Sequence, residues 1–258
     1  MKNWAGTKKI LRCSFCRKPL EAVGKMICSP APQNAVTKWI GISRVYICDE
    51  CVAVCNSLLE GDRRKSPQNT TANQLPLESQ GHCERVTAFT IAIARAMGVP
   101  KKQIRIIARA ALLHDIGKMP IPYSILLKPG QLTEVESAVM REHCWLGYRI
   151  LKRIDFLPET ADIVYAQQER FDGTGYPRGL KGNQIPMGAR IFAVAHTLEA
   201  ITTDRPYRPR RPVSAAREEI GASAGRQFDP EIVETFLSMP EKIWYDLCKE
   251  LDPPQGEF

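Results

Sequence analysis

The chain has 258 residues, of which 44% are hydrophobic and 25% are charged, an ordinary globular composition. This length allows one large core and a small second domain. No segment approaches the roughly 18 consecutive apolar residues of a membrane span, and the first residues lack the apolar core of a signal peptide, so we expect a cytoplasmic protein without membrane contact. The net charge of +8 favours anionic partners such as phosphates, nucleotides or nucleic acid.

Four of the nine cysteines form two C-x-x-C pairs, Cys13 with Cys16 and Cys48 with Cys51. Each pair presents two thiolates to one side, and four thiolates complete a tetrahedral zinc site. Because no position remains for a substrate, we expect a structural zinc ion that contributes most of the folding free energy of this segment. A disulfide or a redox-active C-x-x-C is the alternative.

The cysteine pairs lie within the segments Arg12–Leu20 and Val45–Val52, followed by Cys55–Leu59. These segments resemble the zinc-binding domain of the Clp protease unfoldase ClpX. This chain has a longer stretch between the pairs, which includes Cys28. The resemblance implies a module that dimerises and docks substrates or adaptors, and hence a protein partner and a homodimer. No phosphate-binding G-x-x-x-x-G-K-[ST] motif of an ATPase occurs.

Residues 61–74 contain no large apolar side chain and are rich in Gly, Pro, Asn and Thr, which predicts a linker. The later part of the chain shows helical spacing of apolar residues and no convincing strand pattern. We therefore predict a mainly α fold. It comprises a small zinc-knuckle domain at 1–60, the linker, an all-α domain at 75–240 and a C-terminal extension at 241–258.

Apolar residues recur at helical spacing in three segments of the predicted all-α domain. They are Val86, Phe89, Ile93 and Met97; Ile104, Ile107, Ala108, Ala111 and Leu112; and Ile191, Val194, Ala195, Leu198 and Ile201. The first pattern stops at Gly98–Pro100. Thr133, followed by Glu136, has the spacing of a capping box and predicts a further helix start.

His114 and Asp115 follow the second apolar pattern, so an imidazole and a carboxylate emerge together from a buried helix. Neighbouring His and Asp side chains can both reach one metal ion, although most such pairs in helical proteins are only hydrogen-bonded. Further candidates are Glu78 and His82, which are one helical turn apart, together with His143 and the segment Glu169–Leu180. The four histidines of the chain all belong to this predicted cluster.

Several segments in order resemble the HD-GYP family of metal-dependent phosphohydrolases, whose members hydrolyse the bacterial messenger cyclic di-GMP. They are Leu112–Lys118, Ser124–Gly130, Asp172–Pro177, Asp204–Arg208 and Gln227–Pro230. The resemblance runs from about residue 75 to residue 238. It implies a helical domain in which metal ions activate a water for attack on phosphorus.

The resemblance also implies roles for individual residues. The positions that match the metal ligands of the family are Glu78, His82, His114, Asp115 and His143. Asp115 and Lys118 match catalytic positions, with Lys118 facing a phosphate. Tyr176, Arg205 and Arg208 match residues that contact the dinucleotide.

Three family positions differ in this chain. The family has two adjacent histidines where this chain has Gln167 and Gln168, and an aspartate where it has His196. An amide is a poor metal ligand, whereas His196 can still coordinate a metal. The ligands that remain for one His3Asp site are His82, His114, Asp115 and His196. We expect the second metal, which needs His143, to be lost, and the first to be zinc, iron or manganese.

Several of these candidates also have a purely structural interpretation. His196 could be a hydrogen-bonded histidine near the edge of the core, and His143 a packed remnant. The prolines and arginines of residues 205–212 could form a solvated basic loop; as a phosphate-binding arm they would need Tyr176 and Lys118 close by.

Three functions follow from these observations. The first hypothesis is a degenerate HD-GYP signalling protein, catalytically weak or inactive, that binds a cyclic dinucleotide or a protein partner. The second is an active phosphodiesterase or phosphohydrolase that uses one metal. The third is an adaptor for a Clp-type protease, suggested by the cysteine segment alone.

Overall fold

The computed structural model describes residues 19–22, 26–28, 46–48, 81–204 and 208–251. Contacts within the chain divide it into two units, Met1–Asn69 and Thr70–Phe258. The boundaries predicted at residues 60 and 74 fall outside the described residues and remain predictions.

The first unit contains a short antiparallel strand pair. After the 3-10 helix η1 (Leu20–Ala22), strand β1 (Met26–Cys28) pairs with strand β2 (Tyr46–Cys48). Cys48 is the last residue of β2, whereas Cys13, Cys16 and Cys51 lie outside the described residues. The structural zinc site therefore remains a prediction.

The second unit is helical, apart from an isolated bridge between Ala224 and Phe228. Its helices are α3 (His82–Ala96), α4 (Lys101–Leu112), η2 (Ile116–Lys118), α5 (Tyr123–Leu126), α6 (Glu134–Arg141), α7 (His143–Lys152), α8 (Pro158–Tyr165), η3 (Gly182–Gln184), α9 (Met187–Thr202), α10 (Val213–Ala222), α11 (Pro230–Ser238) and α12 (Lys242–Leu251). The all-α prediction for this part of the chain is confirmed, and its three apolar patterns correspond to α3, α4 and α9.

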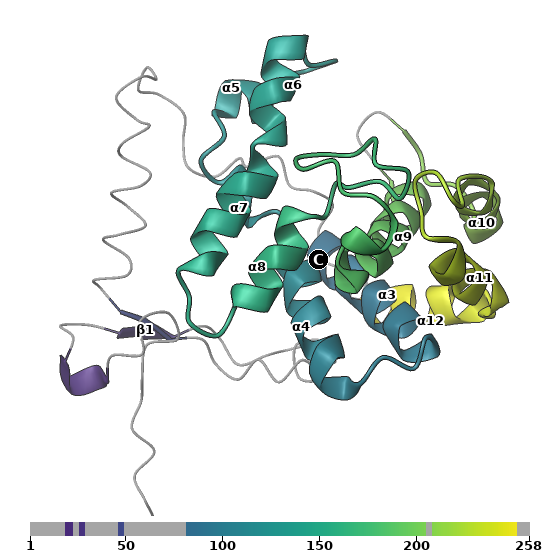
Figure 1. Cartoon of the computed structure of the whole chain (residues 1–258), viewed down its shortest axis with the longest axis horizontal. Coiled ribbons are helices and arrows are strands. Elements are labelled where there is room, and N and C mark those ends of the chain that lie inside the picture. Colours follow the sequence, from purple (N-terminus) through teal and green to yellow (C-terminus); the bar gives the residue numbers. More distant parts are fainter. Residues whose placement is uncertain (1–18, 23–25, 29–45, 49–80, 205–207, 252–258) are drawn as a thin grey trace, which may run out of the picture. The chain divides into compact units, whose positions relative to one another are not determined.

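Helix α3 lies at the centre of the second unit, where it packs against both α4 and α9 (Figure 1). Most of the apolar residues that predicted these helices, such as Ile93, Ile107 and Leu198, are fully buried, whereas Met97 and Leu112 are half-buried. At the other side of α3, the ring of Phe89 meets Trp244 of α12 edge-on, with centroids 5.5 Å apart. Helix α12, within the predicted C-terminal extension, thus contributes Trp244 to the core.

The predicted capping box begins α6. The Thr133 hydroxyl accepts a hydrogen bond from the Glu136 amide at 3.3 Å, and the Glu136 carboxylate accepts one from the Thr133 amide at 2.7 Å. These bonds satisfy amides that the first helical turn leaves without partners. Helices α5 and α6 have no buried residue and extend away from α3, α4 and α9 (Figure 1).

None of the helices in the described ranges combines the length and the apolar character needed to cross a membrane.

Candidate metal centre

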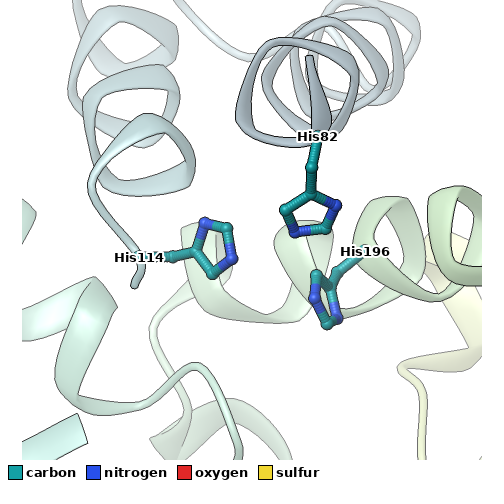
Figure 2. A group of neighbouring side chains, drawn as sticks. All are labelled: His82, His114 and His196. Carbon is teal, nitrogen blue, oxygen red and sulfur yellow. The ribbon is translucent and has the colours of Figure 1, made fainter. Parts of the chain in front are cut away.

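Three histidines from three helical segments meet at one point. His82 begins α3, His114 follows the end of α4, and His196 lies within α9. Each offers a ring nitrogen, and these atoms all lie within 4.8 Å of one another. The ring centroids are 5.3, 5.4 and 5.5 Å apart, so the imidazoles form a nearly equilateral triangle (Figure 2). We call these residues the histidine trio.

The helices that carry the trio are fixed by a small apolar cluster behind it. Val86, Ala111 and Phe192 are buried together, and each is about one helical turn from a histidine of the trio. The Phe192 ring stacks on His196 at 5.2 Å and lies 5.1 Å from the His114 ring. The core that joins α3, α4 and α9 therefore also holds the imidazoles in place.

Hydrogen bonds set the orientation of two of these rings. The Nδ1 atom of His114 lies 2.7 Å from the Ala111 carbonyl oxygen, which can only accept, so this nitrogen carries the proton. The Nδ1 atom of His82 lies 2.8 Å from a carboxylate oxygen of Glu199. In both residues Nδ1 is thus engaged elsewhere, and Nε2 is the atom through which a neutral ring would bind a metal.

His196 is kept neutral by its surroundings. Burial, followed by the proximity of His114 and His82, lowers its pKa to about 3. A neutral imidazole is the form that binds a metal. Of the two readings of His196 from the sequence, its place in the trio favours ligation.

A buried ion pair supports His82 from behind. Glu199 is completely buried, and its Oε1 atom accepts hydrogen bonds from Nη2 of Arg85 at 2.9 Å and from Nε at 3.3 Å. Burial alone would raise the pKa of Glu199, but contact with His82 and Arg85 lowers it to about 2. The carboxylate is therefore ionised and can hold the Nδ1 proton of His82.

Asp115 lies at the edge of the trio. Its Oδ2 atom is 3.1 Å from Nε2 of His114 and 2.8 Å from Nζ of Lys118. The predicted fourth ligand and the predicted phosphate-facing lysine are thus brought together beside His114. The trio itself consists of histidines alone.

The residues at the positions of the predicted second metal site form hydrogen bonds with other protein groups. Gln167 donates from Nε2 to the His114 carbonyl oxygen at 2.8 Å and approaches the Cys144 sulfur at 3.8 Å. The Nδ1 atom of His143 lies 2.8 Å from the Met140 carbonyl oxygen, and its Nε2 is 3.5 Å from the same sulfur. Burial lowers the pKa of His143 and raises that of Cys144 to about 12. His143 is accordingly a packed, neutral residue.

A cavity of about 300 Å³ opens beside His196. Its walls come from α6, α9, the loop after α8 and the turn before α11. They comprise Arg141, Gln167, Gln168, Glu169, Arg170, Thr174, Gly175, Tyr176, Ala193, His196, Thr197 and Gln227. This volume is at the lower end of small-molecule sites, which span roughly 300–1,000 Å³. The cavity connects the trio with Tyr176, a residue predicted to contact the dinucleotide.

Hydrogen bonds to the side chain of Glu169 stabilise the loop that carries Tyr176. This buried carboxylate accepts hydrogen bonds from the backbone amides of Arg178 at 2.8 Å and Leu180 at 3.0 Å. The amide of Tyr176 donates to the Gln168 carbonyl oxygen at 3.2 Å. At Gly175 a Cβ atom would lie 2.3 Å from the Arg170 nitrogen, so only glycine allows the loop to fold this closely.

The remaining predicted residues lie in different surroundings. Glu78 and Arg205 are outside the described residues. Arg208 donates to the Ala200 carbonyl oxygen at 2.6 Å and is not among the residues that line the cavity. The contacts of Arg210 and Arg211, with Asp204 and Glu219, are also local.

Sequence reasoning missed the pair Arg85 and Glu199 and the cavity residue Arg141. The pair had a detectable signal, because Arg85 follows His82 by three residues and Glu199 follows His196 by three, the spacing of neighbours on a helix. Arg141 had none, because its place in the cavity depends on the loop after α8, which lies far from it along the chain.

Comparison with known proteins agrees with this arrangement. The HD domain family matches residues 65–232. The chain belongs to the HD domain family. Over 177 residues this HD domain is 41% identical to a protein of Thermotoga maritima named cyclic di-GMP phosphodiesterase, covering 68% of this chain and 48% of that protein. It is also 36% identical to the 3'3'-cGAMP-specific phosphodiesterase 2 of Vibrio cholerae, covering 62% of this chain and 31% of that protein.

A solved structure shares the fold. An HDG"Y"P protein from Bdellovibrio bacteriovorus superposes with a TM-score of 0.50 at 19% identity, covering 78% of this chain and 64% of that chain. The HD domain described above is therefore of the HD-GYP type and homologous to cyclic di-GMP phosphodiesterases. The chain spans about half of the length of the Thermotoga relative.

Proposed function

We propose that this chain is a metal-dependent phosphodiesterase that hydrolyses a cyclic dinucleotide with one metal ion at the histidine trio. The observation that carries the proposal is the convergence of His82, His114 and His196, whose ligand atoms lie within 4.8 Å of one another. Imidazole ligands suit zinc and iron, and the nearby Asp115 carboxylate adds a harder donor. The donor set therefore fits a divalent transition metal.

When bound, such an ion acts as a Lewis acid that lowers the pKa of a coordinated water and polarises a phosphoryl oxygen. Groups of the protein orient the metal ligands and provide charge near the phosphoryl group. Glu199 holds the Nδ1 proton of His82, and the Ala111 carbonyl oxygen holds that of His114. Lys118, held by Asp115, supplies a positive charge next to the trio, where a phosphoryl group gathers negative charge.

The substrate class rests on the relatives and on the cavity. The two relatives above are named for cyclic di-GMP and for 3'3'-cGAMP, both cyclic dinucleotides. The cavity beside His196 offers the Tyr176 ring, two guanidinium groups and several amides, which suit a base and a phosphate. We therefore propose a cyclic dinucleotide as the substrate, with cyclic di-GMP and 3'3'-cGAMP as the first candidates.

The test is hydrolysis by the purified full chain after loading with zinc, iron or manganese. Release of linear dinucleotide from each candidate would be followed by chromatography, alongside His196→Ala and Asp115→Ala. We expect both variants to lose turnover by at least about a hundredfold while keeping their helical circular dichroism. A metal-loaded parent that binds the dinucleotide without turnover would contradict the proposal.

That contrary outcome is the second candidate function, a binding module without catalysis. Its specific support is Gln167, whose amide is bound to the His114 backbone where the family has an imidazole. A chain with one metal lacks the second clamp on the phosphoryl oxygens, which lowers the expected rate. Equilibrium binding of cyclic di-GMP with no linear product would support this candidate.

The role of the cysteine segment is a separate proposal from the sequence alone. If Cys13, Cys16, Cys48 and Cys51 bind zinc, the segment supplies a protein-interaction or dimerisation module, and an adaptor for a Clp-type protease is one form of that role. Co-purification of the full chain with purified Clp ATPase, compared with Cys13→Ser, would test it. Equal recovery of both proteins would argue against this role.

A further inference from the structure

Arg141 lies where helix α6 meets the cavity beside the histidine trio. It is the last residue of α6, and its exposed side chain lines the same cavity as His196 and Tyr176. The guanidinium carbon lies 5.2 Å from the centroid of the Tyr176 ring. A cation this close to an aromatic face is attracted to it, so Tyr176 holds the guanidinium at the cavity wall.

The charge of Arg141 is not balanced by a carboxylate. Among the described residues it forms no ion pair, whereas Lys118 is paired with Asp115 and Lys128 with Glu136. Within a protein, a guanidinium that lines a cavity without an acidic partner is available to an anionic ligand.

The charged residues that line the cavity are two arginines and one glutamate. Arg170 donates to the neutral Gln227 side chain at 3.0 Å, and its charge also acts on Asp172, which does not line the cavity. Glu169, the carboxylate among the lining residues, is directed to the amides of Arg178 and Leu180. The cavity therefore has an excess of positive charge and favours an anion.

A cyclic dinucleotide contains two phosphodiester groups joined through two nucleosides. If one phosphate is at the histidine trio, the rest of the ring must extend into the cavity that begins at His196. The second phosphate then needs a cationic partner some distance from the trio. A guanidinium can bind two phosphate oxygens at once, which makes arginine well suited to this position.

Resting on the proposed function, we infer that Arg141 binds the second phosphate of the cyclic dinucleotide, the one that is not hydrolysed. Tyr176 positions the guanidinium for this contact. Arg141 thus selects a ligand that carries a second negative charge into the cavity.

The experiment measures the affinity of the full chain for two hydrolysis-resistant ligands. The first is cyclic di-GMP with phosphorothioates at both linkages, which keeps both charges. The second has the same ring with one linkage replaced by a neutral group. Each ligand is titrated by calorimetry into the parent, Arg141→Gln, Arg141→Lys and the charge-matched control Arg105→Gln, which alters an exposed residue of α4 outside the cavity.

We expect Arg141→Gln to weaken the doubly charged ligand by about tenfold or more, as for the loss of a charge-assisted hydrogen bond. The loss should be at least about threefold smaller for the half-neutral ligand, because the interaction is then already absent. Arg141→Lys should recover part of the affinity, and Arg105→Gln should equal the parent.

Three outcomes would overturn the inference alone. Equal losses for both ligands would show that Arg141 acts only through its packing on Tyr176. Equal losses in Arg141→Gln and Arg105→Gln would reduce the effect to general charge. Affinity of Arg141→Gln equal to that of the parent would remove the contact while leaving the proposed function intact. A parent that binds neither ligand would instead refute the proposed function and the inference together.

Discussion

The Nδ1 atom of His82 lies 2.8 Å from the Oε2 atom of Glu199, a carboxylate with no exposed surface. The other oxygen of this carboxylate accepts a hydrogen bond from Arg85, which lies on α3 one helical turn after His82. Metal-bound histidines commonly donate their second nitrogen to such a carboxylate, which fixes the ring and raises its basicity. Glu199 is therefore a positioning residue for His82.

Glu199→Gln should weaken metal binding at the trio by about 10- to 100-fold, because an amide holds the Nδ1 proton less strongly. The measurement is metal affinity by competition with a chelator, with the His82 tautomer followed by nitrogen NMR. Since Arg85 then loses its carboxylate, we expect the variant also to lose about 3–5 kcal/mol of stability. Glu199→Asp keeps the charge and separates the two effects, and Glu219→Gln is the exposed control. Unchanged metal affinity in Glu199→Gln would contradict this role.

Protonation of His196 should oppose folding in acid. Its pKa in the folded chain is about 3, because burial and the nearby His114 and His82 disfavour its charged form. In the unfolded chain a histidine titrates near about 6.5. Below that pH the unfolded chain binds a proton that the folded chain does not. The free energy of unfolding therefore falls with pH down to about 3, by at most about 1.4 kcal/mol per pH unit.

Urea unfolding of the metal-free chain, followed by circular dichroism at several pH values, measures this slope. His196→Leu removes the titrating group, so its free energy of unfolding should depend less steeply on pH between about 6.5 and 4. Identical slopes in the two proteins would show that His196 does not contribute. Addition of metal should raise the stability of the parent more than that of His196→Leu.

Restoring the two family histidines and the aspartate should add metal. In the triple variant Gln167→His, Gln168→His and His196→Asp, imidazoles replace an amide that now donates to the His114 backbone at 2.8 Å. We expect about one more metal ion per chain than in the parent, and faster hydrolysis, because a second ion completes the clamp on phosphate. Elemental analysis gives the stoichiometry. No increase in bound metal would show that His143 and Cys144 pack too tightly to admit an ion.

Glu169→Ala should loosen the loop that carries Tyr176. Two backbone amides, of Arg178 and Leu180, would lose their acceptor, at about 1–3 kcal/mol each if they stay buried. The measurement is thermal unfolding together with limited proteolysis within residues 172–180. Glu234→Ala on the exposed side of α11 is the matched control. Equal protease resistance of Glu169→Ala and the control would exclude a role for Glu169 in holding the loop.

Gly117→Ala should disrupt the site through the backbone. A Cβ atom at Gly117 would lie 1.9 Å from the His143 carbonyl oxygen and 2.5 Å from the Gly147 nitrogen, so η2 and α7 must separate. We expect a loss of stability of about 1–3 kcal/mol or more and weaker metal binding. At Gly221 the same change meets only Leu237, at 3.5 Å, and Gly221→Ala should be neutral or stabilising by up to about 1 kcal/mol. Equal stability of the two variants would contradict the close approach.

The sequence was sufficient for the features that depend on local spacing. Most of the periodic apolar residues predicted for α3, α4 and α9 are buried, and the capping box at Thr133 starts α6. Histidine ligation came instead from a family resemblance, and the structure supports it by bringing His196 to His82 and His114. These residues are far apart along the chain, so no periodicity could have paired them.

The remaining features depend on tertiary geometry. The partner of Arg85 is 114 residues away, and Gln167 reaches back 53 residues to a backbone oxygen. Neither contact has a sequence signature of its own. The amide of Gln167 was predicted to be a weak metal ligand, but its hydrogen bond to the His114 backbone could only be seen in the structure.

The apolar cluster of Val86, Ala111 and Phe192 has a consequence for stability as well as for chemistry. Because α3, α4 and α9 each contribute one histidine next to that cluster, a bound ion ties together three parts of the chain that only folding brings into contact. Metal binding is then linked to folding. When the free ion concentration is a hundred times the dissociation constant, binding stabilises the folded state by about 2.7 kcal/mol. The cell's supply of metal would thereby add to the stability of this protein, even when no substrate is present.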